Sequence, residues 1–154
     1  MFWCIVTGMR EEFGYSKSVM KQRAEEIRKV GALYGFEETI NINLPATAVE
    51  KIPVGVRVRI FSDIFLKIRP DTVYLPFSGD IHSDHRAVFE SACGCIKTFR
   101  YPFCRQVLMM ETLSETEFAV CPSNSVFVPN YFKDISSFME KKLKIMSVYK
   151  SELK

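Results

Sequence analysis

The sequence predicts an α/β fold, in which helices pack on the faces of a mainly parallel sheet. Short apolar runs rich in β-branched and aromatic residues are typical of strands, and they alternate along the chain with longer segments of helical periodicity. The 154 residues, 47% of them hydrophobic, suffice for one core and are too few for two ordinary domains. We therefore expect a single domain over residues 1–154, with its ligand site beyond the carboxyl ends of the strands.

The chain begins with a predicted strand, a helix and a second strand. Residues 2–6 form an apolar run that Gly8 closes. Residues 16–34 repeat apolar side chains at intervals of three and four, and Gly35 follows where a glycine commonly ends a helix. Residues 39–44 alternate apolar and polar side chains, which predicts a strand.

The middle of the chain continues the alternation. Residues 56–68 carry an isoleucine stripe and stop before Pro70, as expected for a helix. Residues 72–75 predict a strand. A helix over residues 84–95 follows, and we expect the Ser83 hydroxyl to cap it by accepting a hydrogen bond from a free amide of the first turn.

The last third contains shorter elements. Strands are predicted at residues 97–101, 106–111 and 126–128. A final amphipathic helix is predicted after Asp134, which is expected to cap it. Its lysines form a cluster that is expected to be a solvated face: Lys141, Lys142 and Lys144.

Composition excludes several classes of protein. A formal net charge of +3 is too small to indicate a nucleic-acid partner. The apolar start of the chain is too short for a signal peptide or a membrane span. The five cysteines are odd in number and lack a disulfide spacing, so a reduced, cytoplasmic protein is expected. The Cys93-x-Cys95 pair fits either a metal site or, without a second pair, buried small apolar residues.

The residues able to bind a metal or take part in catalysis follow the strand predicted at 72–75. Both histidines of the chain, His82 and His85, lie here with the carboxylates of Asp80 and Asp84. At the carboxyl end of a strand, one imidazole is able to reach a metal while the other faces substrate, and a carboxylate is able to orient either ring. The same residues also fit a hydrogen-bonded helix cap with incidental surface histidines, so the motif alone leaves both interpretations open.

Several segments resemble one known family in the same order along the chain. The segment from Asp80 to Val88, Asp-Ile-His-Ser-Asp-His-Arg-Ala-Val, resembles the second signature of the PIG-L/LmbE-like sugar N-deacetylases. Arg23, Glu26 and Tyr34-Gly35 resemble the family's Arg-x-x-Glu helix. The Pro129-Asn130 segment resembles its Pro-Asn-x-x-x-Asp-Ile motif, and the Val-Thr-Gly at 6–8 and the Tyr-Lys-Ser-Glu at 149–152 also have counterparts.

The resemblance implies a three-layer Rossmann-like fold and a zinc-dependent hydrolase that removes acetate from an N-acetylglucosamine-type conjugate. It implies His85 as a zinc ligand and His82 as the general acid or electrostatic partner of the carbonyl, with Asp84 tuning His82. Arg23 is either a substrate-binding residue or an ion-paired surface group, and Asn130 either lines the pocket or shapes a loop.

The family's first signature, His-Pro-Asp-Asp, does not occur in the sequence. In the family it follows the first strand and supplies two zinc ligands and the general base. We therefore expect an N-terminally truncated chain without the first central strand, from a start at an internal methionine or a degraded gene, with weak or absent zinc binding. The alternative function is a non-catalytic remnant that binds a sugar or a partner protein.

Overall fold

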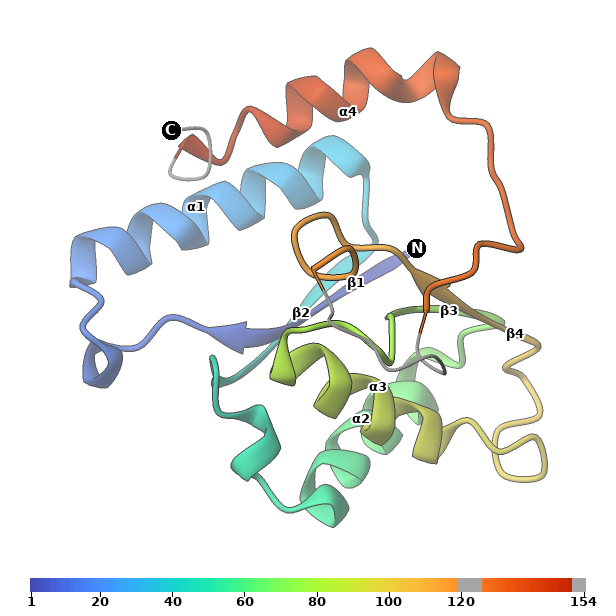
Figure 1. Cartoon of the computed structure of the whole chain (residues 1–154). Helices are drawn as coiled ribbons and strands as arrows, with labels where there is room; N and C mark the ends of the chain where they lie inside the picture. The colour runs from blue at the N-terminus through green and yellow to red at the C-terminus, as the bar shows by residue number, and fades with distance from the viewer. Residues whose placement is uncertain (119–125, 151–154) are drawn as a thin grey trace. The chain divides into compact units, whose positions relative to one another are not determined.

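The structure is a computed structural model that describes residues 1–118 and 126–150 (Figure 1). These residues divide into two compact units: Met1–Pro45 with the described residues from Asn130 onward, and Ala46–Pro129. No helix within the described ranges is long and apolar enough to cross a membrane. The elements in chain order are β1 (Phe2–Gly8), η1 (Glu11–Phe13), α1 (Lys17–Tyr34), β2 (Glu38–Pro45), η2 (Val49–Lys51), α2 (Val54–Ile68), β3 (Thr72–Pro76), α3 (Ser83–Cys95), β4 (Gln106–Met110), η3 (Ser136–Phe138) and α4 (Met139–Met146).

In the first unit, β1 and β2 pair in parallel and α1 connects them (Figure 1). A parallel pair needs a long crossover connection, and a helix commonly provides it. The predicted ends of α1 are confirmed. The Ser16 hydroxyl caps its start by accepting from the Val19 amide at 3.3 Å, and Gly35 ends it in the left-handed conformation at φ 74°.

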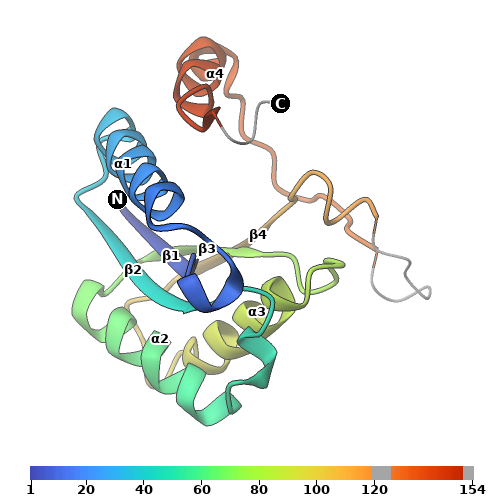
Figure 2. The ribbon, with the colours of Figure 1, turned by 90° about the vertical axis from the view of Figure 1, so that its left-hand side faces the viewer.

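The last helix of this unit lies beside α1, as the two ribbon views agree (Figures 1 and 2). It begins later than predicted. The Asp134 carboxylate accepts from the amide and the hydroxyl of Ser136, which lowers the pKa of Asp134 but forms a local turn rather than a cap of α4. Ile145 is buried, whereas the three lysines of the cluster are exposed, as predicted.

In the second unit, β3 and β4 pair in parallel with Thr72 opposite Gln106 and Pro76 opposite Met110. Both strands therefore end at the same edge. The helices α2 and α3 lie side by side (Figure 2), and α3 packs on β3. The buried apolar side chains of this unit come from both helices, from β3 and from the adjoining loops: Val49, Phe61, Phe65, Leu75, Phe77, Ala87, Val88, Ala92, Cys95, Tyr101 and Cys104.

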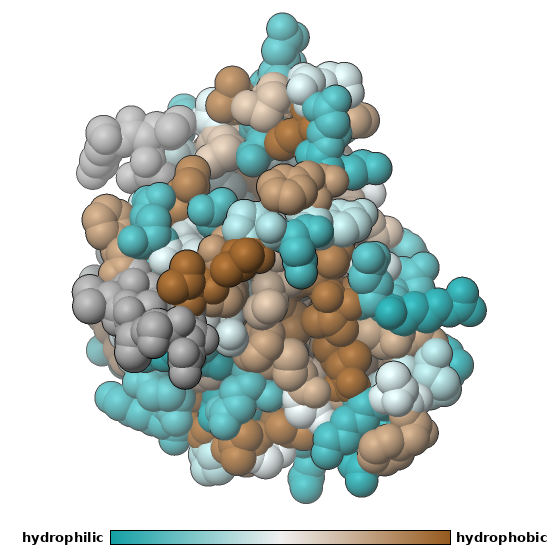
Figure 3. All heavy atoms as spheres, turned by 45° about the vertical axis from the view of Figure 1, so that its right-hand side comes forward, coloured by the Kyte–Doolittle hydropathy of each residue, from teal (hydrophilic) through white to brown (hydrophobic). Residues whose placement is uncertain are grey.

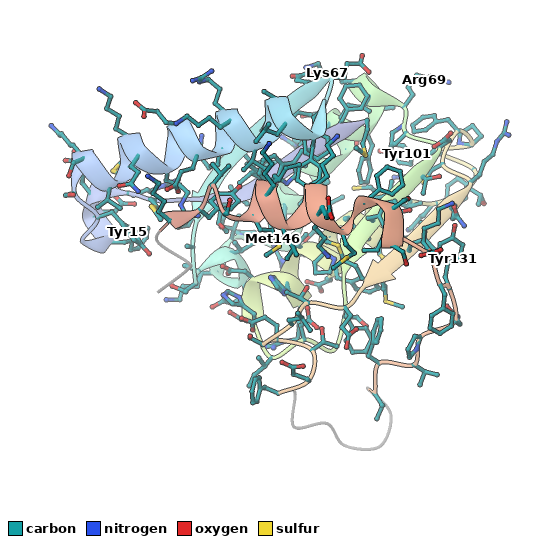
Figure 4. All side chains as sticks on the ribbon, turned by 90° about the horizontal axis from the view of Figure 1, so that it is seen from above. Tyr15, Lys67, Arg69, Tyr101, Tyr131 and Met146 are labelled. Atoms are coloured by element: carbon teal, nitrogen blue, oxygen red, sulfur yellow. The ribbon has the colours of Figure 1, made fainter. Side chains whose placement is uncertain are left out.

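Two predicted strands are wrong. The segment at 97–101 forms a turn, because the amides of Arg100 and Tyr101 both donate to the Lys97 carbonyl. The Tyr101 side chain, labelled in Figure 4, is buried, and its hydroxyl is hydrogen-bonded to Ser62 of α2 at 2.6 Å. Its aromatic ring thus anchors a turn on a helix. The segment at 126–128 is also not a strand; Val126 and Val128 are exposed.

The α/β class, with parallel strands flanked by helices, is confirmed. In the part of the chain that the structure describes, the strands form two separate parallel pairs, β1–β2 and β3–β4, rather than one continuous sheet. Hydrophobic side chains also reach the surface, as the brown areas of Figure 3 show. The prediction of a single domain stays a prediction.

Candidate functional site

The histidine loop, residues 77–85, comprises the connection from the carboxyl end of β3 and the first three residues of α3, so that His82 precedes the helix and His85 lies in its first turn. The predicted cap of α3 is off by one residue. His82, not Ser83, is the N-cap, and its Nδ1 accepts from the Asp84 amide at 3.2 Å. The Ser83 hydroxyl instead donates to Glu50 at 3.2 Å. Because Nδ1 of His82 accepts a hydrogen bond, the neutral imidazole carries its proton on Nε2.

The second imidazole has the opposite arrangement. Nδ1 of His85 lies 2.8 Å from Oδ2 of Asp80, whose side chain is fully buried, while the His85 side chain is 29% exposed. A carboxylate accepts hydrogen bonds, so His85 donates from Nδ1 and its Nε2 keeps a free lone pair. The two rings stack with their centroids 5.0 Å apart. The loop therefore presents one N–H donor and one nitrogen lone pair side by side.

Asp80 is held by further contacts. Its Oδ1 accepts from the Thr116 hydroxyl at 2.6 Å, and its backbone carbonyl accepts from the Arg86 guanidinium at 2.7 Å. Arg86 also donates to the Ile81 carbonyl. Sequence reasoning named neither Thr116 nor Arg86 as site residues. Arg86 stands within the quoted motif, whereas no sequence pattern marks Thr116.

The Asp84 carboxylate contacts the backbone of residues 46–51, and the tuning of His82 that the resemblance implies stays a prediction. Its Oδ2 accepts from the Thr47 amide at 2.7 Å and its Oδ1 from the Val49 amide at 3.0 Å. The side chain is buried, and both oxygens thus bind the backbone of the 46–51 loop rather than the His82 ring. Thr47 has a φ of 59°, a left-handed conformation that is uncommon for a β-branched residue. Asp84 therefore ties a strained loop to the start of α3.

The other predicted residues lie in the first unit. Arg23, on α1, forms an ion pair with the buried Glu26 at 3.7 Å, and its guanidinium lies 5.1 Å from the centre of the Tyr149 ring. Burial raises the pKa of Tyr149, and Arg23 opposes that rise. The ion-paired interpretation of Arg23 is thus supported. Asn130 is exposed. For both residues, a contact with substrate stays a prediction.

The cysteine pair supports the apolar interpretation. Cys95 is buried, and its thiol donates to the carbonyl of Val58 at 3.2 Å. Burial raises the pKa of Cys93 and of Cys95. Cys121 lies outside the described residues, as do the last two positions of the segment at 149–152.

The amino-acid sequence matches one family model. The family model PIG-L, described as GlcNAc-PI de-N-acetylase, matches residues 1–95, from the start of the chain to the end of α3. A comparison with curated proteins finds no match.

Two solved structures share the fold. The conserved protein TT1542 from Thermus thermophilus superposes with a TM-score of 0.69 at 21% identity, over 96% of this chain and 65% of that one. N,N'-diacetylchitobiose deacetylase from Pyrococcus horikoshii superposes with a TM-score of 0.64 at 23% identity, over 97% of this chain and 58% of that one. This chain thus spans less than two thirds of either structure. The family match covers more than half of the chain and includes the histidine loop, so the chain belongs to the PIG-L (GlcNAc-PI de-N-acetylase) family.

Proposed function

We propose that this chain acts in the metal-dependent hydrolysis of an N-acetylglucosamine-type sugar conjugate, with release of acetate. The description of the family, a GlcNAc-PI de-N-acetylase, supports the reaction. The name of the structurally similar chitobiose deacetylase supports an N-acetylated sugar as the class of substrate. The observation that carries the proposal is the pair of stacked imidazoles that follows β3, in which Nδ1 of His82 faces a backbone amide and Nδ1 of His85 faces a carboxylate.

We assign His82 to the carbonyl and the leaving group of the substrate. In amide hydrolysis, water adds to the carbonyl carbon, the C–N bond breaks, and the amine leaves with a proton. An imidazole that carries hydrogen on Nε2 is able to donate to the carbonyl oxygen as negative charge develops there. When protonated, the same ring is able to give a proton to the departing nitrogen. The cap bond to Nδ1 supports this role because it leaves Nε2 of His82 free for substrate.

We assign His85 as a zinc ligand through Nε2. A histidine ligand commonly donates its other ring nitrogen to a carboxylate, as His85 does to Asp80. Bound zinc lowers the pKa of water to about 7 in hydrolases of this kind. A catalytic zinc usually takes three protein ligands, and no group of three His, Cys, Asp or Glu side chains able to hold a metal occurs within residues 1–118 and 126–150. His85 therefore fits as one ligand, and no step is assigned to the ion.

The proposed partners and compartment follow from the sequence. We propose an N-acetylated sugar conjugate as substrate, with Arg23 and Asn130 as candidate sugar-binding residues, and no nucleic-acid partner. The cysteines within the described ranges, Cys4, Cys93, Cys95 and Cys104, are free thiols, which supports a reducing compartment such as the cytoplasm.

Zinc stoichiometry and acetate release from N-acetylglucosaminyl-phosphatidylinositol and N,N'-diacetylchitobiose test the proposal. We expect weak zinc binding, and acetate release in excess zinc that His85→Ala abolishes together with the residual zinc binding. We expect His82→Ala to lose release but keep zinc, because His82 is assigned to substrate. Lys141→Ala, in the exposed lysine cluster, is the control and is expected to match the unmodified protein.

Two results would contradict the proposal. Unchanged zinc content in His85→Ala would exclude His85 as a ligand. Binding of the sugar without acetate release, in the presence of excess zinc, would favour the non-catalytic alternative for this chain.

A further inference from the structure

The loop that follows β4 contacts the histidine loop through two hydrogen bonds. The Thr116 hydroxyl donates to Oδ1 of Asp80 at 2.6 Å, and the Ile81 amide donates to the Glu115 carbonyl at 3.1 Å. Both loops start at the carboxyl ends of paired parallel strands, so they leave the same edge of the sheet. Residues that are distant in the sequence thus meet beside His85.

Thr116 has a defined hydrogen-bond direction. Its Oγ1 accepts from the Thr112 amide at 2.9 Å, so its hydrogen is available for Asp80. Oδ1 of Asp80 is thereby satisfied, and Oδ2 faces Nδ1 of His85 at 2.8 Å. Asp80 is 1% exposed and Thr116 is 9% exposed, so water competes little for these bonds. The chain of bonds runs from a backbone amide through a hydroxyl and a carboxylate to one imidazole nitrogen.

We propose that Thr116 is a positioning residue, which acts through Asp80 to hold His85 in the form with hydrogen on Nδ1 and a free lone pair on Nε2. The functional meaning rests on the proposed function, in which that lone pair binds zinc. Without the Thr116 hydroxyl, Oδ1 of Asp80 loses a bond in a buried site, and the carboxylate either turns or admits water. In either case its hold on His85 weakens.

Nitrogen-15 NMR of the histidine side chains in the metal-free protein tests this inference, because it distinguishes the two neutral forms of an imidazole. With only two histidines, a His82→Gln variant assigns the signals. We expect His85 in the unmodified protein to carry its proton on Nδ1. Thr116→Val keeps the shape but removes the hydroxyl, and we expect the ratio of the Nδ1–H to the Nε2–H form to fall about twofold to tenfold, the effect of roughly one hydrogen bond.

Two further variants separate positioning from general stability. Thr116→Ser restores the hydroxyl and is expected to restore the ratio. Thr112→Val is the matched control from the same turn, because the Thr112 hydroxyl makes no hydrogen bond to any residue that the structure describes, while its amide is kept. We expect the control to leave the His85 signals unchanged. Thr116→Ala replaces Thr116→Val if the valine variant does not fold.

The inference is overturned if His85 in the unmodified protein carries its proton on Nε2. It is also overturned if removal of the Thr116 hydroxyl lowers the melting temperature but leaves the His85 signals unchanged, since Thr116 would then be structural only. These measurements need neither zinc nor substrate. Absence of acetate release would therefore count against the proposed function and leave the NMR result standing.

Discussion

The Asp84 carboxylate is the most informative single group to remove, because its structural contacts and its role implied by resemblance predict different outcomes. In Asp84→Ala, the Val49 amide loses its acceptor in a residue with no exposed surface. An unsatisfied buried amide costs about 1–3 kcal/mol. The Thr47 amide belongs to an exposed residue and is able to bind water instead, so its loss adds about 0.5–1.5 kcal/mol.

Asp84 also stands in the first turn of α3, where a negative charge contributes about 0.3–1 kcal/mol. Together these effects predict that Asp84→Ala lowers the free energy of unfolding by about 2–5 kcal/mol, a large part of the stability of an ordinary domain. Asp84→Asn keeps one acceptor, and its effect is expected to be about half as large.

Urea unfolding followed by far-UV circular dichroism measures this loss. Fluorescence is less suitable, because the one tryptophan, Trp3, belongs to the other unit. Ser83→Ala is the matched control: its hydroxyl bonds the exposed Glu50, so removal is expected to change the free energy by less than about 0.5 kcal/mol. If Asp84→Ala is no less stable than this control yet loses acetate release, the structural explanation is refuted and a role as partner of His82 regains support.

Three further outcomes are expected. Arg23→Ala is expected to lower the free energy of unfolding, measured by urea denaturation, by about 1–3 kcal/mol, because it leaves the buried Glu26 carboxylate without its cation. The control is Arg28→Ala, since Arg28 is exposed on the same helix. A raised KM of Arg23→Ala with unchanged stability would instead indicate sugar binding. Arg57→Ala is expected to lose about 2–4 kcal/mol in the same assay, since the buried guanidinium bonds two backbone carbonyls and Glu90; no loss would contradict its bridging role. Burial raises the pKa of Cys4 from 9.0 to about 11, so alkylation of Cys4 from pH 8 to pH 10 is expected to accelerate about 90-fold in the folded chain against about 10-fold in urea. Equal acceleration in the two states would show an unshifted thiol.

The raised pKa of Cys4 also predicts how the stability of the folded chain changes with pH. The folded chain binds the thiol proton more tightly than the unfolded chain does, so the contribution of Cys4 is fully present below pH 9. It is lost as the pH rises from 9 through about 11.

Local chemistry was enough to predict most elements of the fold. The helical periodicity of α1 and its ends at Ser16 and Gly35 depend on neighbouring residues, and the structure confirms them. The strand predicted at 97–101 is wrong because the aromatic and polar residues of this segment fit a strand as well as they fit a turn. Only the hydrogen bond between the Tyr101 hydroxyl and Ser62 distinguishes the two. That partner lies 39 residues away, beyond the reach of any local pattern.

The candidate site divides in the same way. The histidine loop was predicted at the carboxyl end of a strand, and the general expectation that a nearby carboxylate orients an imidazole holds for Asp80 and His85. The implied pairing of Asp84 with His82 does not include the contacts that the structure shows. The amides that donate to the Asp84 carboxylate come from the 46–51 loop, and their position depends on how that loop folds back. No sequence pattern indicates Thr116 as a site residue, since a single hydroxyl in a polar loop is common.

The left-handed backbone at Thr47 has a consequence for engineering the chain. A threonine in this conformation stores roughly 1–2 kcal/mol that glycine would not, because glycine has no side chain to collide with the following carbonyl. Replacement by glycine keeps the amide that faces Asp84 while relieving the crowding, although it gives the unfolded chain more freedom. Saturation mutagenesis of residues 46–51 for thermostability should therefore recover glycine at position 47 more often than at its neighbours in this segment, whose φ angles are not left-handed.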